Sequence, residues 1–360
     1  MSEFKPGLEG VVAFETEIAE PDRDGGALRY RGVDIEDLVG RLPFENVWGL
    51  LVDNAPYPGL EPAAPYTAEG LTGDAPADLQ AVTARLSGEW QLDKLIDISD
   101  DTARDDLARL SATMISVVAQ SARLADGQTS PVDPDLVATG ATAATRFLLE
   151  WRGEADPKHV RAVDTYWICT AEHGLNASTF TARVVASTGA DCAAALSSAV
   201  GALSGPLHGG APARVLPMLD AAAAADSIDD FVKDLLDSGD RLMGFGHRVY
   251  RAEDPRSRLL RGTAMDLGSR RFDVAEELER AALAELHRRK PDRVLATNVE
   301  FWSAVVLDVA DVPPALAPAM FACSRTAGWS AHVLEQKRLG RLVRPSATYV
   351  GPGPRALATG

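Results

Sequence analysis

The sequence predicts a mainly α-helical protein with a minor β contribution near its two ends. Across the 360 residues, apolar side chains recur at helical spacing in successive blocks, which turns rich in Gly, Pro and Asp separate. Alternating patterns typical of strands are scarce. No linker of biased composition divides the chain, so we expect any second domain to be an insertion into a core that both ends form.

The strand candidates lie near the termini. They are 10–17 and 28–32 at the start of the chain and 348–351 near its end. The segment 55–78 is rich in Pro, Ala and Gly, and we expect it to be an irregular connection.

One helix has clear signals at both ends. Ser227 followed by Asp230 is typical of a capping box, and Gly239 should stop the helix that follows. The apolar positions between them repeat at i, i+3, i+4, i+7 and i+8, as an amphipathic helix requires. Similar blocks predict helices at 104–125, 135–151, 158–171, 191–204, 273–289, 298–310 and 314–337.

Composition excludes several classes of protein. No apolar run approaches the roughly 20 residues of a membrane span, and the first ten residues lack a secretory pattern, so we expect a cytoplasmic protein. Three cysteines without CxxC pairing disfavour both disulfides and a zinc cluster, and predict buried, reduced thiols. The 36 basic and 52 acidic residues give a net charge of −16, which disfavours binding to nucleic acid or anionic membranes.

Arginine is nevertheless concentrated in one segment. Eight arginines lie between Arg241 and Arg271 against three acidic residues, a local balance of 8 − 3 = +5. Such a cluster around a histidine could recruit a small anion. It could equally be a solvated helix face with ion pairs at i,i+4.

The sequence lacks the motifs of the commonest nucleotide-binding and hydrolase sites. The patterns GxxxxGK[ST], GxGxxG, GxSxG and HExxH are all missing, and no carboxylate cluster accompanies the histidines, so we expect no metal. Three histidines instead lie in turn-like settings: His173 in AEHGLNAS, His208 in GPLHGG and His247 in GFGHRVY. Glycines there allow close approach of a ligand to the backbone.

Three arginines are candidates for carboxylate recognition, because a guanidinium binds a carboxylate through two parallel hydrogen bonds. They are Arg256 in DPR, Arg325 in SRT and Arg344 in VRP; the alternative for each is a surface salt bridge. Glu300 in NVEFW begins a predicted helix, whose dipole favours an ionised carboxylate. It is a candidate general base, or an ordinary acidic residue of a first helical turn.

Taken in order, these motifs resemble those of a citrate synthase of the shorter bacterial and archaeal type. The resemblance runs from 7–11 and 28–32 through HGLNASTFTARV, GPLHGG, GFGHRVY with DPR, and RTAGWSAHVLEQ to RLVRPSATYVG. It covers most of the chain and is weakest over about 55–130. It implies a mostly helical homodimer, in which a small domain at 210–311 closes over a large domain of 1–209 and 312–360.

The resemblance also implies roles for the histidines. His208 would polarise the thioester carbonyl of acetyl-CoA. His247 would polarise and protonate the ketone of oxaloacetate, which His173 would also contact. Because a thioester methyl is a weak carbon acid, its deprotonation needs a base on one side and a hydrogen-bond donor at the carbonyl on the other. Burial would keep His208 neutral.

For the arginines, the resemblance implies that Arg256 and Arg325 bind the carboxylates of oxaloacetate together with Arg344 from the other subunit. Arg251 matches a basic position that contacts a phosphate of CoA. No cofactor is expected, since acetyl-CoA is a substrate.

One position departs from the family pattern. The family has aspartate in NVDFYSG, whereas this chain reads NVEFWSA and has Glu300 at the position of the base. Displacing a catalytic atom by about 1 Å can cost on the order of 100-fold in rate. Our hypothesis is that Glu300 remains the base.

Three functions therefore stay open. We favour citrate synthase, which releases citrate and CoA. A 2-methylcitrate synthase using propionyl-CoA shares the motifs, and one methylene discriminates by only about 1–3 kcal/mol in an apolar pocket. The third is a non-catalytic helical dimer that binds CoA or dicarboxylates.

Overall fold

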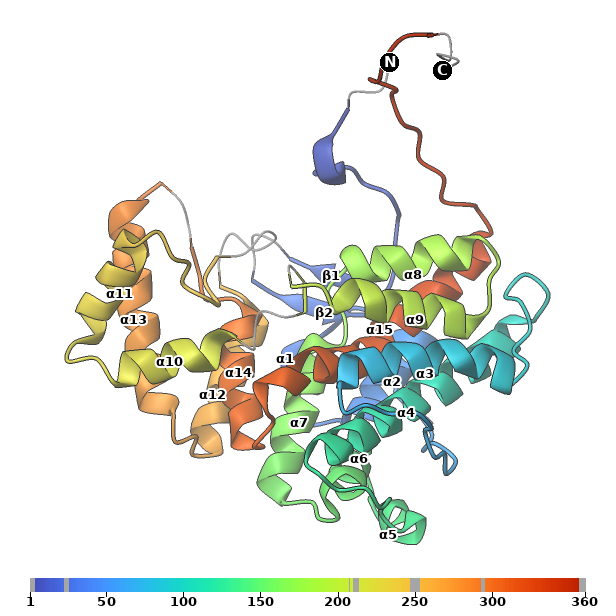
Figure 1. The fold of residues 1–360 in the computed structure, drawn as a ribbon, viewed down its shortest axis with the longest axis horizontal. Helices are drawn as coiled ribbons and strands as arrows, with labels where there is room; N and C mark the ends of the chain where they lie inside the picture. Colours follow the sequence, from blue (N-terminus) through green and yellow to red (C-terminus); the bar gives the residue numbers. More distant parts are fainter. Residues whose placement is uncertain are drawn as a thin grey trace, which may run out of the picture.

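The computed structural model describes residues 4–22, 26–206, 208–209, 214–246, 253–292 and 295–355. Two candidate residues, His247 and Arg251, lie outside the described residues. The mainly helical fold is confirmed (Figure 1). The helices are α1 (Ile35–Leu38), α2 (Phe44–Asp53), α3 (Ala75–Glu89), α4 (Asp100–Ala125), α5 (Pro134–Ala138), α6 (Ala143–Arg152), α7 (Pro157–Thr170), α8 (Ala177–Ser187), α9 (Cys192–Leu203), α10 (Val215–Ala223), α11 (Ile228–Asp237), α12 (Pro255–Asp266), α13 (Phe272–Arg289), α14 (Val299–Val309) and α15 (Ala317–Leu339), with short 3₁₀ helices at Pro6–Leu8 and Pro314–Leu316.

Helix α15 is the centre of the larger group of helices. It is buried along most of its length and packs against α2, α4, α7, α8 and α9. Ser324 Oγ lies 2.7 Å from Thr170 Oγ1 at the end of α7. At Gly328 an added Cβ would lie only 2.7 Å from the Ala171 carbonyl oxygen. Close packing of small residues therefore fixes the loop after α7 against the middle of α15.

Helices α10 to α14 form a second group, at the left in Figure 1. Within it, α12 packs against α14, α11 against α13, and α10 against both α13 and α14. Contact with the larger group is made by α12 and α14 on α7. The inserted domain expected at 210–311 covers this second group, and its role as a separate closing domain stays a prediction.

The β structure is small and, apart from an isolated bridge between Phe245 and Thr297, lies near the N-terminal end of the described chain. Strands β1 (Ala19–Pro21), β2 (Leu28–Tyr30) and β3 (Val33–Asp34) form an antiparallel sheet in the order β1-β2-β3. The strand predicted at 28–32 is confirmed in its first half. The strands predicted at 10–17 and 348–351 are wrong, because neither segment has a partner strand among the described residues with which to form a ladder.

Most predicted helices are confirmed, including the capping box, in which the Ser227 side chain accepts a hydrogen bond from Asp230 N. The helix predicted at 135–151 is wrong as one unit. It divides into α5 and α6, because Thr142 caps a new helix and Gly140 packs tightly on Arg146. The irregular segment ends at residue 74, where Asp74 caps α3. Helices α1, α2, α3, α8, α10 and α12 were not predicted.

Both ends of the chain leave the body of the molecule on the same side (Figure 1). Glu335 Oε1 holds the N-terminal segment by accepting hydrogen bonds from Thr16 Oγ1 and Glu17 N. Large apolar side chains are exposed on both ends, among them Val12 and Val350. Across the described residues, no helix is long and apolar enough to cross a bilayer. The three cysteines are buried and free, as predicted.

Candidate active site

Five of the candidate residues that the structure describes gather around the middle of α15, whereas Arg344 lies apart from them on the exposed C-terminal segment. Arg325 lies on α15, Arg256 in the first turn of α12 and Glu300 in the first turn of α14. His173 lies in the loop between α7 and α8, and His208 follows α9. Segments that are far apart in sequence therefore meet where α12 and α14 pack on α7 and where α15 packs on α7 and α8.

His208 is held by a serine that sequence reasoning missed. Ser178 Oγ, in the first turn of α8, lies 2.9 Å from His208 Nε2. The same oxygen lies 2.8 Å from Asn176 Oδ1 and accepts a hydrogen bond from Trp329 Nε1 at 3.2 Å. The ring of Phe321 packs edge-on against the imidazole. The imidazole is thereby oriented by groups from α8 and α15.

The same surroundings keep His208 uncharged. Burial, with a smaller contribution from the positive charge of Arg325, lowers the pKa of His208 to about 4. At neutral pH the side chain is therefore a neutral imidazole. Such a group can donate one ring N–H to a substrate oxygen while its other nitrogen accepts a hydrogen bond.

Arg325 is not a surface residue. Its side chain is 2% exposed, its Nε donates to the Thr170 carbonyl oxygen at 2.7 Å, and its guanidinium lies 4.7 Å from the centre of the Phe321 ring. Burial lowers its pKa, while the charge of Glu172 opposes this effect. Nη1 is buried and has no hydrogen-bond partner among the described residues. A buried donor of this kind favours a ligand that supplies an acceptor, as a carboxylate does.

Arg256 is 3% exposed, and Asp254 orients it. Its Nε and Nη2 donate to the two carboxylate oxygens of Asp254 at 2.9 and 2.8 Å. Asp254 also caps α12 and accepts a hydrogen bond from Val299 N at 3.1 Å. One carboxylate thus joins the start of α12 to the start of α14. The alternative of a surface salt bridge is wrong for both Arg256 and Arg325.

The position of Glu300 is fixed by Asn298, the residue that caps α14. The Asn298 side chain accepts from Glu300 N at 2.9 Å and donates to the Gly246 carbonyl oxygen at 3.0 Å. Gly244 has a φ of +86°, and an added Cβ there would lie 2.6 Å from Phe301 Cβ. Only glycine fits this position, which explains one glycine of the GFGH motif.

The charge state of Glu300 reflects two opposing effects. Burial raises its pKa above the ordinary glutamate value, while the positive charge of Arg256 lowers it. The half-buried carboxylate is therefore a stronger base than an exposed one and still has a cation nearby. Burial raises the pKa of the nearby Tyr166, on which the charges of Arg325 and Glu300 also act.

His173 is half-buried in a loop that a buried ionic network supports. Next to it, Glu172 is 0% exposed, and its Oε1 lies 3.4 Å from His332 Nε2. Arg183 Nη1 lies 2.9 Å from His332 Nδ1 and also donates to Glu335 Oε2. Because a guanidinium only donates, Nδ1 must accept, and the proton of the neutral His332 ring lies on Nε2, facing Glu172.

The remaining arginines fall into two classes. Arg258 pairs with Glu36 and Glu253, and Arg271 with Asp220 and Asp308; Arg261 and Arg270 make similar ion pairs. The ion pairs of these four are confirmed, but their predicted i,i+4 spacing is wrong, because none of the partners lies four residues away. Arg344 is exposed on the C-terminal segment and makes no ion pair with the described residues.

Within the ranges that the structure describes, no group of three or more His, Cys, Asp or Glu side chains could hold a metal ion. Sequence reasoning missed Ser178, Trp329, Asp254 and Tyr30. Tyr30 is buried and its hydroxyl hydrogen-bonds to the backbone of Ile168 and Glu172, which fixes the end of α7. Of these, only Asp254 carried a signal, since Asp followed by Pro is typical of a helix start.

Comparison with known proteins identifies the family. A family model described as the C-terminal domain of citrate synthase matches residues 7–346. The chain belongs to the citrate synthase family. The members of this family are acyltransferases.

Relatives match the chain over nearly its whole length. It is 61% identical over 355 residues to a protein of Mycobacterium tuberculosis named putative citrate synthase 2, covering 98% of this chain and 94% of that one. It is 32% identical over 367 residues to a 2-methylcitrate synthase of Shewanella oneidensis, covering 97% and 95%. Citrate synthase of Thermoplasma acidophilum, solved as a ternary complex with carboxymethyl coenzyme A and oxaloacetate, superimposes with a TM-score of 0.85 at 27% identity, covering 99% and 98%.

Proposed function

We propose that this member of the citrate synthase family condenses acetyl-CoA with oxaloacetate and hydrolyses citryl-CoA to citrate and CoA. The observation that best supports the proposal is the neutral state of His208 in a site that also gathers Arg325, Arg256 and Glu300. The reaction needs a neutral hydrogen-bond donor, a carboxylate base and fixed cations, and these groups meet each need.

In the proposed first step, the Glu300 carboxylate takes a proton from the methyl group of acetyl-CoA. The electron pair of the broken C–H bond moves toward the thioester carbonyl oxygen. An N–H of His208 donates a hydrogen bond to that oxygen, where negative charge develops. A neutral imidazole can fill this role because one of its ring nitrogens still carries a proton to donate.

In the proposed second step, the enolate carbon attacks the ketone carbon of oxaloacetate, and His247 protonates the ketone oxygen. Arg256 and Arg325 would bind the two carboxylates of oxaloacetate together with Arg344 of a neighbouring subunit, and His173 would contact the same substrate. Water then hydrolyses the thioester bond of citryl-CoA, which releases CoA and citrate.

Two larger features belong to the proposal. The helices of 210–311 would close over the site and exclude water until condensation is complete, with Arg251 contacting a phosphate of CoA. A homodimer would cover the apolar side chains that both chain ends expose and would bring Arg344 to the neighbouring site.

The preferred acyl substrate is tested by measuring oxaloacetate-dependent release of CoA from acetyl-CoA and from propionyl-CoA at steady state. We expect a higher kcat/KM with acetyl-CoA. A strong preference for propionyl-CoA would instead make the protein a 2-methylcitrate synthase. If calorimetry detected binding of both substrates but neither acyl-CoA released CoA, the proposed catalysis would be wrong.

A further inference from the structure

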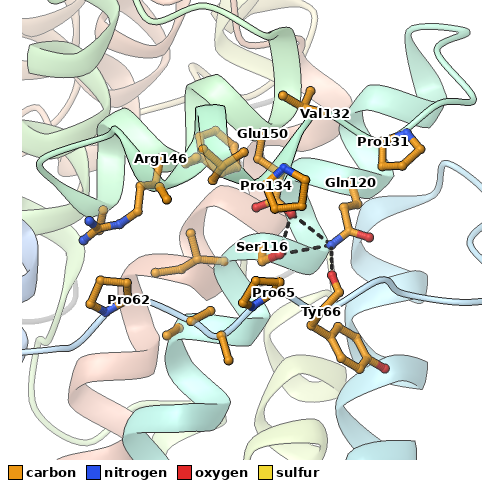
Figure 2. A pocket seen from close by; sticks show the side chains of 18 of the residues that line it. Pro62, Pro65, Tyr66, Ser116, Gln120, Pro131, Val132, Pro134, Arg146 and Glu150 are labelled. Carbon is orange, nitrogen blue, oxygen red and sulfur yellow. Dashed lines mark hydrogen bonds between the residues drawn. The ribbon is translucent and has the colours of Figure 1, made fainter.

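A cavity of about 250 Å³ lies away from the candidate active site, between α4, α5, α6 and the segment 60–67. Its walls are mostly apolar and rich in proline, as Figure 2 shows with Pro62, Pro65 and Pro134. A cavity of about 150 Å³ already admits benzene, so this one has room for an aromatic ring with a short substituent.

One carboxyl group dominates the polar chemistry of the cavity. Glu150 Oε1 accepts hydrogen bonds from Ser116 Oγ at 2.6 Å and from Gln120 Nε2 at 3.0 Å. Figure 2 shows these three side chains directed toward one another at the centre of the cavity. Its second oxygen, Oε2, accepts no hydrogen bond from the described residues. The carboxyl group is therefore anchored through one oxygen and has acceptor capacity left on the other.

No cation of the described chain pairs with this carboxyl group. The two arginines that line the cavity donate to backbone carbonyl oxygens, Arg146 to Gly140 and Arg123 to Ser130 and Trp151. Figure 2 shows Arg146 directed away from Glu150. Burial accordingly raises the pKa of Glu150 to about 7, and no positive charge opposes this effect.

We infer that this cavity is a binding site for a small organic amine, whose apolar body fills the proline-lined space and whose ammonium group donates to Glu150. An ammonium ion supplies both a hydrogen-bond donor for the second oxygen of Glu150 and the paired positive charge that this carboxylate lacks. The net charge of −16 also favours the approach of a cation. This inference does not rest on the proposed reaction.

The test compares two probes of nearly equal size, benzylamine, which is an ammonium ion at neutral pH, and benzyl alcohol, which is uncharged. Binding to the full-length protein is measured by calorimetry or by protein NMR. We expect benzylamine to bind at least about tenfold more tightly than benzyl alcohol, the factor that one charge-assisted hydrogen bond typically provides.

Two variants locate the binding. Glu150→Gln removes the charge and keeps the shape of the side chain. It should therefore remove most of the preference for benzylamine and leave the affinity for benzyl alcohol within about twofold of the wild-type value. Val137 is half-buried on α5 and lines the cavity, so Val137→Phe should fill part of the space and weaken the binding of both probes. Far-ultraviolet circular dichroism and thermal unfolding, unchanged in both variants, check folding.

The pH dependence provides a separate test. Besides Glu150, the ionisable groups that line the cavity are Glu61, Tyr66, Arg123 and Arg146. Because the ammonium binds the ionised carboxylate, benzylamine affinity should rise as pH increases through about 7 in the wild-type protein and stay flat in Glu150→Gln. Equal affinity for the two probes, or benzylamine binding that neither variant changes, would overturn the inference, as would the absence of binding by both probes to the wild-type protein.

Discussion

Ser178 Oγ lies 2.9 Å from His208 Nε2, although the two residues are 30 positions apart. The serine hydroxyl has one proton and faces two acceptors, Asn176 Oδ1 and His208 Nε2, while the Trp329 indole N–H donates to its oxygen. When Ser178 donates to Nε2, the neutral imidazole carries its proton on Nδ1. The direction of the hydrogen bond between Ser178 and His208 thus decides which ring nitrogen of the neutral His208 carries the proton.

The first prediction follows from this contact. Ser178→Ala should lower kcat by about 10- to 100-fold, because it removes the hydroxyl that sets the orientation and tautomer of His208. The KM for oxaloacetate should change little. Steady-state kinetics measure both quantities. Thr181→Ala on the same helix, where the hydroxyl only bonds the Ala177 carbonyl oxygen, is the matched control and should keep wild-type kinetics. Equal losses in the two variants would contradict the role of Ser178.

Arg325 should control affinity for oxaloacetate. Arg325→Lys keeps the charge but loses the planar fork and its hydrogen bond to Thr170, so we expect the KM for oxaloacetate to rise about 100-fold. Arg270→Lys, an exposed ion-paired arginine, should leave KM unchanged. An unchanged KM in Arg325→Lys would show that another group holds the substrate carboxylate.

Activity should fall at acid pH because of Glu300 rather than His208. The base must be ionised, and burial raises the pKa of Glu300, so kcat/KM for acetyl-CoA should fall as pH decreases through a value above the ordinary glutamate pKa of about 4.3. His208, with a pKa of about 4, stays neutral over that range. A pH profile that remained flat down to about pH 4 would be inconsistent with a raised pKa at the base.

The buried network beneath the His173 loop should be important for stability. Arg183→Met leaves Glu335 and His332 without their donor, and we expect a loss of about 3 kcal/mol in the free energy of unfolding. Arg338→Met, in which an exposed ion pair with Asp100 is lost, should cost about 0.5 kcal/mol or less. Urea unfolding of the wild-type protein and the two variants, at the same protein concentration, measures these changes in the free energy of unfolding. Similar losses in the two variants would mean that burial of the Arg183 network adds nothing.

The sequence predicted most of the helices and the residue types of the site, because apolar periodicity and short motifs are local signals. It did not predict that Asp254 holds Arg256, or that Ser178 meets His208, since these contacts depend on how α8, α12 and α14 pack. Helix α12 was also not predicted, because the arginines between its apolar residues interrupt the spacing that indicates a helix.

The two strand predictions and the prediction of a single helix at 135–151 failed for different reasons. A strand needs a partner, and the alternating pattern at 10–17 says nothing of whether one is present. The break between α5 and α6 was signalled by Gly140 and the capping Thr142, but the apolar pattern continues through both helices.

We expect Glu300 to take the proton from acetyl-CoA despite the extra methylene of its side chain. Turnover of Glu300→Gln measures this most directly, with Glu300→Asp to test the length of the side chain and Glu276→Gln, an exposed glutamate on α13, as the control. We predict a loss of about 1000-fold in kcat for Glu300→Gln, a change of at most about 100-fold for Glu300→Asp, and wild-type turnover for Glu276→Gln. Near-wild-type turnover of Glu300→Gln would contradict the account.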